Sequence, residues 1–245
     1  MILNKQEKVI AVIPALNEEG KIGIVVSRVK KSGGDLIDEI LVVDDGSKDN
    51  TSQEAKTNGA SVIKHESNKG VGSAIRSGID YAKKNKFEII LIMGGDNQDN
   101  PSEMNRLLFP VIFDSFDFVQ GSRYMAGGER VNIPLFRLIT THIYSFLLRI
   151  VLNFPVTDGT NGFRAFKLKI FDNPKINIWQ DWLDRYELEP YIFYKAIEYN
   201  FKVTEAPVTK SYPDGNRIGY TKMIPIFSWW SILRPLILLK LGIKK

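Results

Sequence analysis

Short strand-like runs alternate with helical patterns along the first half of the chain, and this alternation constrains the fold more than any other feature. The runs are apolar or β-branched and lie at 9–13, 39–43, 61–63, 87–93 and 116–120. The clearest helical pattern starts at Gly70, where Val71, Ile75 and Ile79 recur on one face. Strands that alternate with helices are typical of a mostly parallel sheet flanked by helices, so we expect an α/β fold.

Composition limits the size and chemistry of the protein. The 245 residues, 44% of them hydrophobic, are enough to bury one large core or two small ones. There is no cysteine, which excludes disulfides and thiolate zinc sites, and His65 and His142 are the only imidazoles. Any metal must therefore be held by oxygen. The polar segment 1–7 lacks the apolar stretch of a signal peptide, so we expect a cytoplasmic protein.

The most informative strand exit follows the run 87–93. Gly94 and Gly95 come first, then Asp96 and Gln98, before Pro101 opens a helix. In an open parallel sheet, ligands bind beyond the carboxyl ends of the strands. Oxygen donors beside glycines, which allow close backbone approach, predict a phosphate-bearing ligand with a hard metal. A polar turn without a ligand is the alternative.

Taken one at a time, the segments that follow the other predicted strands are weaker evidence for a ligand site. The first lacks the glycine fingerprint of dinucleotide binding, which counts against a nicotinamide or flavin enzyme. The second ends in Asp44 and Asp45, which could accept hydrogen bonds from a base and a ribose or serve as a turn and helix cap. Lys69 and Gly70 stand at a helix start, where free N–H groups favour an anion.

In their order along the chain, these segments resemble the inverting family 2 glycosyltransferases of GT-A fold. The segments are Pro14-Ala15-Leu16-Asn17-Glu18-Glu19, Asp44-Asp45-Gly46-Ser47, Asn68-Lys69-Gly70, Asp96 with Gln98, Gly121-Ser122-Arg123-Tyr124, Thr157-Asp158 to Gly162-Phe163-Arg164, and Glu205-Ala206-Pro207-Val208. The resemblance runs from about Val9 to Lys222. Within the family, the chain looks most like the dolichol-phosphate mannose synthase group, which acts on polyprenyl phosphates at the membrane.

The resemblance implies a role for each matching residue. The nucleobase and ribose pocket would be lined by Pro14, Ala15, Asn17, Glu18, Asp44 and Asp45, with Lys69, Gly70 and Gly95 nearby. Asp96 and Gln98 would bind Mg²⁺ or Mn²⁺, Arg123 would contact phosphate, and a loop with Arg217 and Lys222 would cover the phosphates. One departure matters, because Gly94 stands where the family has its first metal-binding acid. That leaves room for a non-catalytic homologue that only binds a nucleotide sugar.

Such an enzyme moves a sugar from a nucleoside diphosphate, here a UDP- or GDP-sugar, by in-line attack at the anomeric carbon. A polyprenyl phosphate acceptor is already anionic and needs no base. A sugar hydroxyl, as in polysaccharide or glycolipid synthesis, needs a carboxylate to take its proton, and Asp158, Glu187 and Glu189 are the candidates. A structural role in a turn or helix cap is the alternative for each of these acids.

The end of the chain predicts contact with a membrane. After Asp214 there are no acids, whereas Trp229 and Trp230 are interleaved with bases, which are Arg217, Lys222, Arg234, Lys240, Lys244 and Lys245. This pattern favours an anionic phospholipid surface over nucleic acid, with core packing or a homo-oligomer contact as alternatives. The block 135–152 is apolar on nearly every face and should be either fully buried or partly in lipid.

We therefore expect a GT-A domain over 1–220 and a basic amphipathic tail over 221–245. Within the domain, 1–125 would form the nucleotide-sugar half and 126–220 the acceptor-side half. The tail would hold the protein on the inner face of the cytoplasmic membrane.

Overall fold

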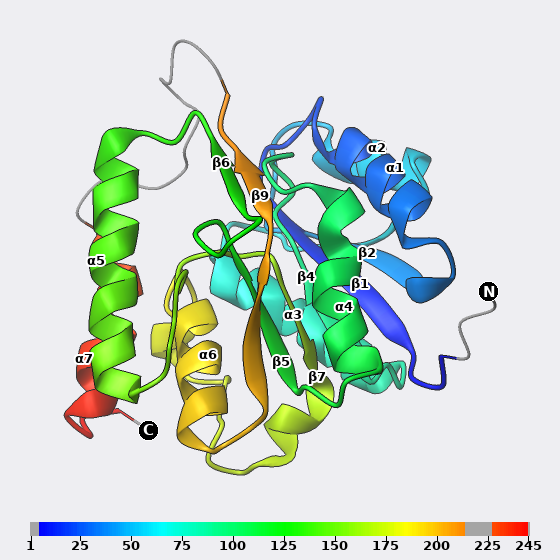
Figure 1. Ribbon diagram of the computed structural model, residues 1–245. Helices are drawn as coiled ribbons and strands as arrows, with labels where there is room; N and C mark the ends of the chain where they lie inside the picture. Colours follow the sequence, from blue (N-terminus) through cyan, green and yellow to red (C-terminus); the bar gives the residue numbers. More distant parts are fainter. Residues whose placement is uncertain (1–4, 214–226, 245) are drawn as a thin grey trace.

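Seven strands form one sheet, in the order β3-β2-β1-β4-β7-β5-β8, in the computed structural model, which describes residues 5–213 and 227–244 (Figure 1). Its strands are β1 Val9–Ala15, β2 Glu39–Asp44, β3 Ser61–Lys64, β4 Ile89–Ile92, β5 Phe118–Ser122, β7 Arg164–Lys167 and β8 Val203–Pro207. Two further strands, β6 Glu129–Val131 and β9 Thr209–Ser211, form a small parallel pair. The five strands predicted from the sequence all occur, with shifted ends.

Helices cover both faces of the large sheet. They are α1 Ile22–Gly33, α2 Thr51–Thr57, α3 Val71–Lys84, α4 Met104–Ile112, α5 Leu135–Leu152, α6 Leu188–Glu198 and α7 Phe227–Lys240, with short 3-10 turns η1 Gly34–Leu36, η2 Pro101–Glu103, η3 Leu168–Asp172 and η4 Asp181–Leu183. On β1, Val9 and Ala11 pack beneath α1 and α4, whereas Ile10 and Val12 pack beneath α3. Because both faces are covered, β1 is apolar at consecutive positions. The predicted α/β fold, a mostly parallel sheet flanked by helices, is confirmed.

Strand β7 is an element of the large sheet that the sequence pattern did not predict. It lies between β4 and β5 and runs antiparallel to both, with Arg164 opposite Ile92 on one side and Gln120 on the other. An antiparallel strand begins where its neighbours end. The segment 158–163, which leads into β7, is therefore brought to the carboxyl ends of β4 and β5, the edge at which ligands bind in such sheets.

Helix α5 matches the predicted apolar block, but it is not fully buried. Only Thr141, Tyr144, Ser145 and Leu148 are buried. Large apolar side chains are exposed along the rest of the helix, namely Leu135, Phe136, Ile139, Ile143, Phe146, Leu147 and Ile150. Among the described residues, α5 is the one helix long and apolar enough to cross a membrane. In Figure 1 it lies at the outer edge of the molecule, beside α7.

Helix α7 shares its apolar residues between the core and the outside. Ile232 and Leu236 are buried against the rest of the domain, whereas Trp230 and Ile237 are exposed. The guanidinium of Arg234 turns inward and donates to Glu187 at 2.5 Å. Arg234 is thus committed to an ion pair, a correction to its predicted place among the membrane-facing bases. The predicted domain boundary at 220, together with Arg217 and Lys222, lies outside the described residues.

Candidate active site

A cavity of about 500 Å³ opens at the carboxyl ends of β1 and β4. It is lined by the exit of β1, the start of α3, the exit of β4, the segment 159–164 and the start of α6. The predicted residues that line it are Pro14, Ala15, Glu18, Asp45, Gly70, Gly95, Asp96, Gln98, Arg123 and Glu189. Segments that are far apart in the sequence thus meet at the edge where the strand exits predicted a ligand.

Asp44 and Asp45 do not act as a pair, in contrast to the prediction. Successive side chains at a strand end point to opposite sides. Asp44 is fully buried outside the cavity, where it accepts hydrogen bonds from the backbone N–H of Ser47 at 2.8 Å and from the hydroxyl of Ser52. These donors outweigh burial and lower the pKa of Asp44. Asp44 therefore stabilises the turn, and Asp45 alone faces the cavity.

Asp45 fixes the start of α3. Its carboxylate accepts hydrogen bonds from the backbone N–H groups of Lys69, at 2.9 Å, and Gly70, at 2.8 Å. Its Oδ1 also lies 2.7 Å from Nδ1 of His65. Gly70 has a φ of +102°, and a Cβ there would lie 2.4 Å from the carbonyl oxygen of Asp184. Only glycine fits this turn. Lys69 itself is exposed and does not line the cavity.

Asn17, predicted to line the nucleobase pocket, also lies outside it. Its side chain is exposed, and its Oδ1 accepts the backbone N–H of Lys48 at 2.9 Å. Its own backbone N–H donates to the hydroxyl of Ser47 at 2.8 Å. Asn17 therefore links the exit of β1 to the exit of β2 by hydrogen bonds and does not line the pocket itself.

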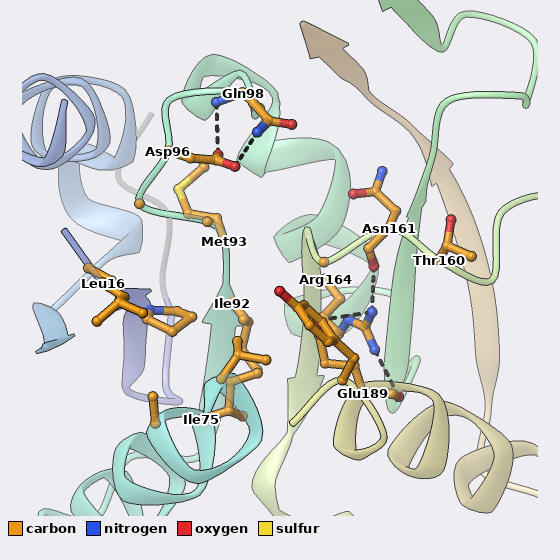
Figure 2. A pocket seen from close by; sticks show the side chains of 18 of the residues that line it. Leu16, Ile75, Ile92, Met93, Asp96, Gln98, Thr160, Asn161, Arg164 and Glu189 are labelled. Carbon is orange, nitrogen blue, oxygen red and sulfur yellow. Dashed lines mark hydrogen bonds and ion pairs between the residues drawn. The ribbon is translucent and has the colours of Figure 1, made fainter. Parts of the chain in front are cut away.

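The exit of β4 presents Asp96 to the cavity. Gln98 donates to this carboxylate from its backbone N–H at 3.2 Å and from its side-chain amide (Figure 2). The loop is held from outside by Arg28, which donates to Asn97 at 2.8 Å and to Asn100 at 3.0 Å. Asp96 is thus positioned at the ligand edge by a braced loop.

Negative charge gathers at this exit. Burial raises the pKa of Asp96, and the nearby carboxylates of Asp99 and Glu18 add to the rise, while Lys210 opposes it. Asp99 is itself paired, since its Oδ1 lies 2.8 Å from Nζ of Lys210. Burial lowers the pKa of Lys210, but Asp99 and Asp96 outweigh burial and raise it. A lysine that the sequence analysis missed therefore lies beside Asp99 and Asp96.

The donor set at this exit fits a metal ion that is shared with a ligand. Within residues 5–213 and 227–244, no group of three or more histidines and acids could hold a metal by itself. Asp99 is occupied by Lys210, which leaves Asp96 and the amide oxygen of Gln98. Mg²⁺ and Mn²⁺ accept few protein oxygens when phosphates and water complete their shell. Asp96 and Gln98 fit that role, and a cage made by protein alone is not present among these residues.

At the exit of β5, Arg123 and Asp158 form a buried ion pair. The guanidinium donates from Nε at 2.6 Å and from Nη2 at 2.7 Å to the two oxygens of Asp158. It also donates to the hydroxyls of Tyr212 at 2.6 Å and Thr160 at 2.7 Å. Of its five N–H donors, four are therefore used within the protein. Arg123 lines the cavity, but it has little left for the phosphate contact that the sequence analysis assigned to it.

Asp158 is not free to act as a base. Burial alone would raise its pKa, but the charge and hydrogen bonds of Arg123 outweigh burial and lower it. The backbone N–H of Asp158 donates to Glu205 at 2.9 Å, so the acid of the predicted Glu-Ala-Pro-Val strand holds it from behind. Asp158 is fully buried and does not line the cavity. This geometry favours a role in positioning Arg123 over the predicted role as a base.

The two remaining candidate bases differ in position. Glu187 is buried outside the cavity, where its carboxylate accepts a hydrogen bond from Arg234. Glu189 lines the cavity and lies 3.2 Å from Nη2 of Arg164. Arg164 is itself buried and donates to the carbonyl oxygens of Glu189 at 3.0 Å and Asn161 at 2.5 Å. Figure 2 shows Asn161, Arg164 and Glu189 across the cavity from Asp96. Glu189 is thus the one of the three candidate bases that lines the cavity.

Several basic residues of the cavity were not assigned a role from the sequence. They are Arg137 of α5, Arg164 of β7, Arg185 before α6 and Lys210 of β9. Arg164 ends a motif that the sequence analysis quoted, and Arg137 stands near the start of the apolar block. Nothing in the sequence pointed to Lys210, because β9 is only three residues long and shows no hydrophobic periodicity. Each of them joins the site only through the fold.

Comparison with known proteins identifies the family of this chain. The model of glycosyl transferase family 2 matches residues 10–173. A UDP-N-acetylglucosamine–dolichyl-phosphate N-acetylglucosaminyltransferase of Methanococcus voltae is 30% identical, over 94% of this chain and 95% of the relative. A polyprenol monophosphomannose synthase of Mycolicibacterium smegmatis is 29% identical, over 89% and 81%.

Among solved structures, glucosyl-3-phosphoglycerate synthase from Mycobacterium tuberculosis, in complex with Mn²⁺, UDP and glucosyl-3-phosphoglycerate, has the same fold. Its TM-score is 0.71 at 18% identity, over 98% of this chain and 82% of that one. The family predicted from the order of the strand exits is confirmed. The chain belongs to glycosyl transferase family 2.

Proposed function

We propose that the protein is an inverting, metal-dependent glycosyltransferase that moves a sugar from a UDP- or GDP-sugar to a polyprenyl phosphate at a membrane surface. One observation carries this proposal. The cavity that holds Asp96 is also lined by Arg137 of α5 and Ile232 of α7, two neighbouring helices that carry large exposed apolar side chains. A site for a polar donor therefore adjoins a surface suited to a lipid-linked acceptor.

The donor would lie along the exits of β1, β2 and β4. Glu18 and Asp45 line this part of the cavity, and Gly70 allows close approach to the start of α3. A divalent ion held by Asp96, Gln98 and the donor phosphates would stabilise the charge that develops on the departing nucleoside diphosphate. The names of the relatives include both N-acetylglucosamine and mannose as the transferred sugar, so they support the class of donor and leave the sugar open.

A phosphate acceptor fits the cavity better than a sugar hydroxyl. Arg137 and Arg185 line it, and arginine is well suited to bind phosphate oxygens. A phosphate is already anionic and needs no base, whereas a hydroxyl does. Asp158 and Glu187 are held in buried ion pairs. A sugar hydroxyl acceptor would have to rely on Glu189, whose carboxylate is paired with Arg164.

The outer side of α5 supports peripheral attachment to a membrane. Phe146 and Ile150 are 59% and 63% exposed, and large apolar surfaces of this kind bind lipid or another protein. On the neighbouring side, Lys240 at the end of α7 and Lys244 just after it are exposed. An anionic surface would attract them. Attachment to the inner face of the cytoplasmic membrane and assembly as a homo-oligomer stay predictions.

A transfer assay tests this function. Radiolabelled UDP-glucose, UDP-galactose, UDP-N-acetylglucosamine and GDP-mannose would be offered with polyprenyl phosphate in anionic vesicles or with water-soluble sugars. Mg²⁺, Mn²⁺ or EDTA would be present. We expect label in the lipid fraction from one donor, with a divalent ion. Label in the soluble sugars alone would support the hydroxyl acceptor, and nucleotide binding without any transfer would indicate a non-catalytic homologue.

A further inference from the structure

The missing acid at position 94 faces two carboxylates that are already present. A Cβ built on Gly94 would lie 3.1 Å from Oδ1 of Asp96 and 3.6 Å from Oδ2 of Asp99. The backbone N–H of Gly94 also donates to Asp99 at 3.1 Å. An acid at position 94 would therefore add a third negative charge beside two others, and like charges at this distance repel one another unless a cation lies between them.

A cation does lie at this place, and it belongs to the protein. Lys210 lies 2.8 Å from Asp99, lines the cavity, and has a side chain that is only 13% exposed. Its backbone forms an antiparallel bridge with Asp99. The preceding residue, Thr209, donates to Glu103 from its backbone N–H at 2.6 Å and from its hydroxyl at 2.9 Å. The backbone at Lys210 is thus held in place, and its ammonium group is paired with Asp99.

The ammonium has capacity for a ligand. Lysine has three N–H donors. Asp99 accepts one of them. The charge of Lys210 offsets that of Asp99, so a diphosphate that approaches this exit meets less repulsion, and Asp96 stays available for a metal ion that enters with the donor. Glycine at position 94 fits this arrangement, because the protein supplies a fixed positive charge where another acid would have strengthened the metal site.

We propose that Lys210 binds the diphosphate of the donor, so that nucleotide binding persists without a divalent ion. This inference rests on the proposed function, since it takes the ligand to be a nucleoside diphosphate. A purely structural pair between Lys210 and Asp99 is the competing explanation. The two differ in what happens to nucleotide affinity when the lysine loses its charge or when it loses its partner.

Calorimetric titration with UDP and GDP, each in Mg²⁺ and in EDTA, tests the inference. We expect wild-type protein to bind one of them in EDTA, and Lys210→Met to weaken that binding about tenfold or more, the usual size for a hydrogen bond to a charged group. Lys195→Met is the matched control. Lys195 is a buried lysine paired with Glu198 at 2.7 Å outside the cavity, so its loss should leave nucleotide affinity unchanged.

A second variant keeps the test valid if Lys210→Met fails to fold. Asp99→Asn leaves the lysine in place and removes its partner, so metal-free nucleotide binding should tighten, whereas a structural role predicts no gain. The inference is overturned if the wild type needs a metal ion for any binding, or if Lys210→Met binds in EDTA as tightly as the wild type. No binding of either nucleotide under any condition would refute the proposed function itself and the inference with it.

Discussion

The exits of β4 and β5 lie at the same edge of the sheet, but their charged residues differ. Those at the exit of β5 are neutralised by partners within the protein, whereas Asp96 at the exit of β4 lies near other acids. At the exit of β5, Arg123 and Asp158 satisfy each other almost completely. At the exit of β4, Asp96 lies near Asp99 and Glu18, and burial raises its pKa. A charged side chain at a ligand edge is therefore not by itself evidence of ligand contact. The number of its partners within the protein decides whether it is available.

Removal of Asp158 should have the largest effect on stability. Asp158→Ala leaves the buried guanidinium of Arg123 without its carboxylate, and breaking such a pair costs about 3–5 kcal/mol. Denaturant unfolding measures this loss. Asp184→Ala is the control, because it breaks a pair with Arg76 in which the aspartate is 45% exposed, where less than about 1 kcal/mol is expected. Equal losses in both variants would mean that the exit of β5 is not the tightly paired region that its geometry indicates.

The same pair should make stability depend on pH. The folded pKa of Asp158 is lowered, because Arg123 outweighs burial. Its contribution is therefore present above the unfolded pKa of about 4 and is lost as pH falls through the lower folded value. Unfolding curves below pH 4 should show a smaller decline for Asp158→Asn than for the wild type. A parallel decline in both proteins would remove Asp158 as the cause.

Removal of Asp96 should affect catalysis and spare the fold. Asp96→Ala should slow sugar transfer by about 100-fold or more, the size seen when one group that stabilises developing charge is lost. Its melting temperature should stay close to that of the wild type, since burial and the nearby carboxylates of Asp99 and Glu18 disfavour the charge of Asp96. Asp172→Ala, an exposed acid paired with Lys83 away from the cavity, serves as the control. Near-normal turnover in Asp96→Ala would show that the exit of β4 is not the catalytic one.

A charged substitution on α5 should reduce membrane binding without affecting ligand binding at the exits of β4 and β5. Phe146→Glu should reduce binding to anionic vesicles, because an aromatic side chain that leaves water contributes about 1.5–3 kcal/mol. Nucleotide binding should be unchanged, since Phe146 does not line the cavity. Co-sedimentation with vesicles measures the first quantity and calorimetry the second. If vesicle binding is unaffected, the exposed side of α5 is better explained as a contact between copies of the chain.

The bases of the tail should have the smallest effect. Replacing Lys240, Lys244 and Lys245 by Glu should weaken vesicle binding, each base contributing about 1 kcal/mol near an anionic surface. High salt should reduce the binding of the wild type in the same way. Arg234→Ala should differ from these changes, because Arg234 is paired with Glu187 and its loss should lower the stability of the fold. Salt-insensitive binding would assign membrane contact to α5 alone.

The sequence by itself predicted five strands of the sheet, the polar segments that follow them and the family. Strand runs, the helical pattern from Gly70 and the order of the exit motifs are local, so each can be read within a few residues of itself. Asp96 and Gln98 follow directly after β4, and their place at the ligand edge follows from the strand that precedes them. Local pattern is sufficient wherever a residue's position depends on the element next to it.

Only the tertiary structure decided which charged residues are free. Arg123 and Asp158 are 35 residues apart, and Lys210 meets Asp99 across 111 residues. Strand β7 has four residues and no period, yet its insertion between β4 and β5 brings the segment 158–163 to the site. An ion pair depends on two side chains that meet only when the sheet has closed. The sequence shows that both charges exist, and the fold determines whether they pair with each other or are available to bind a ligand.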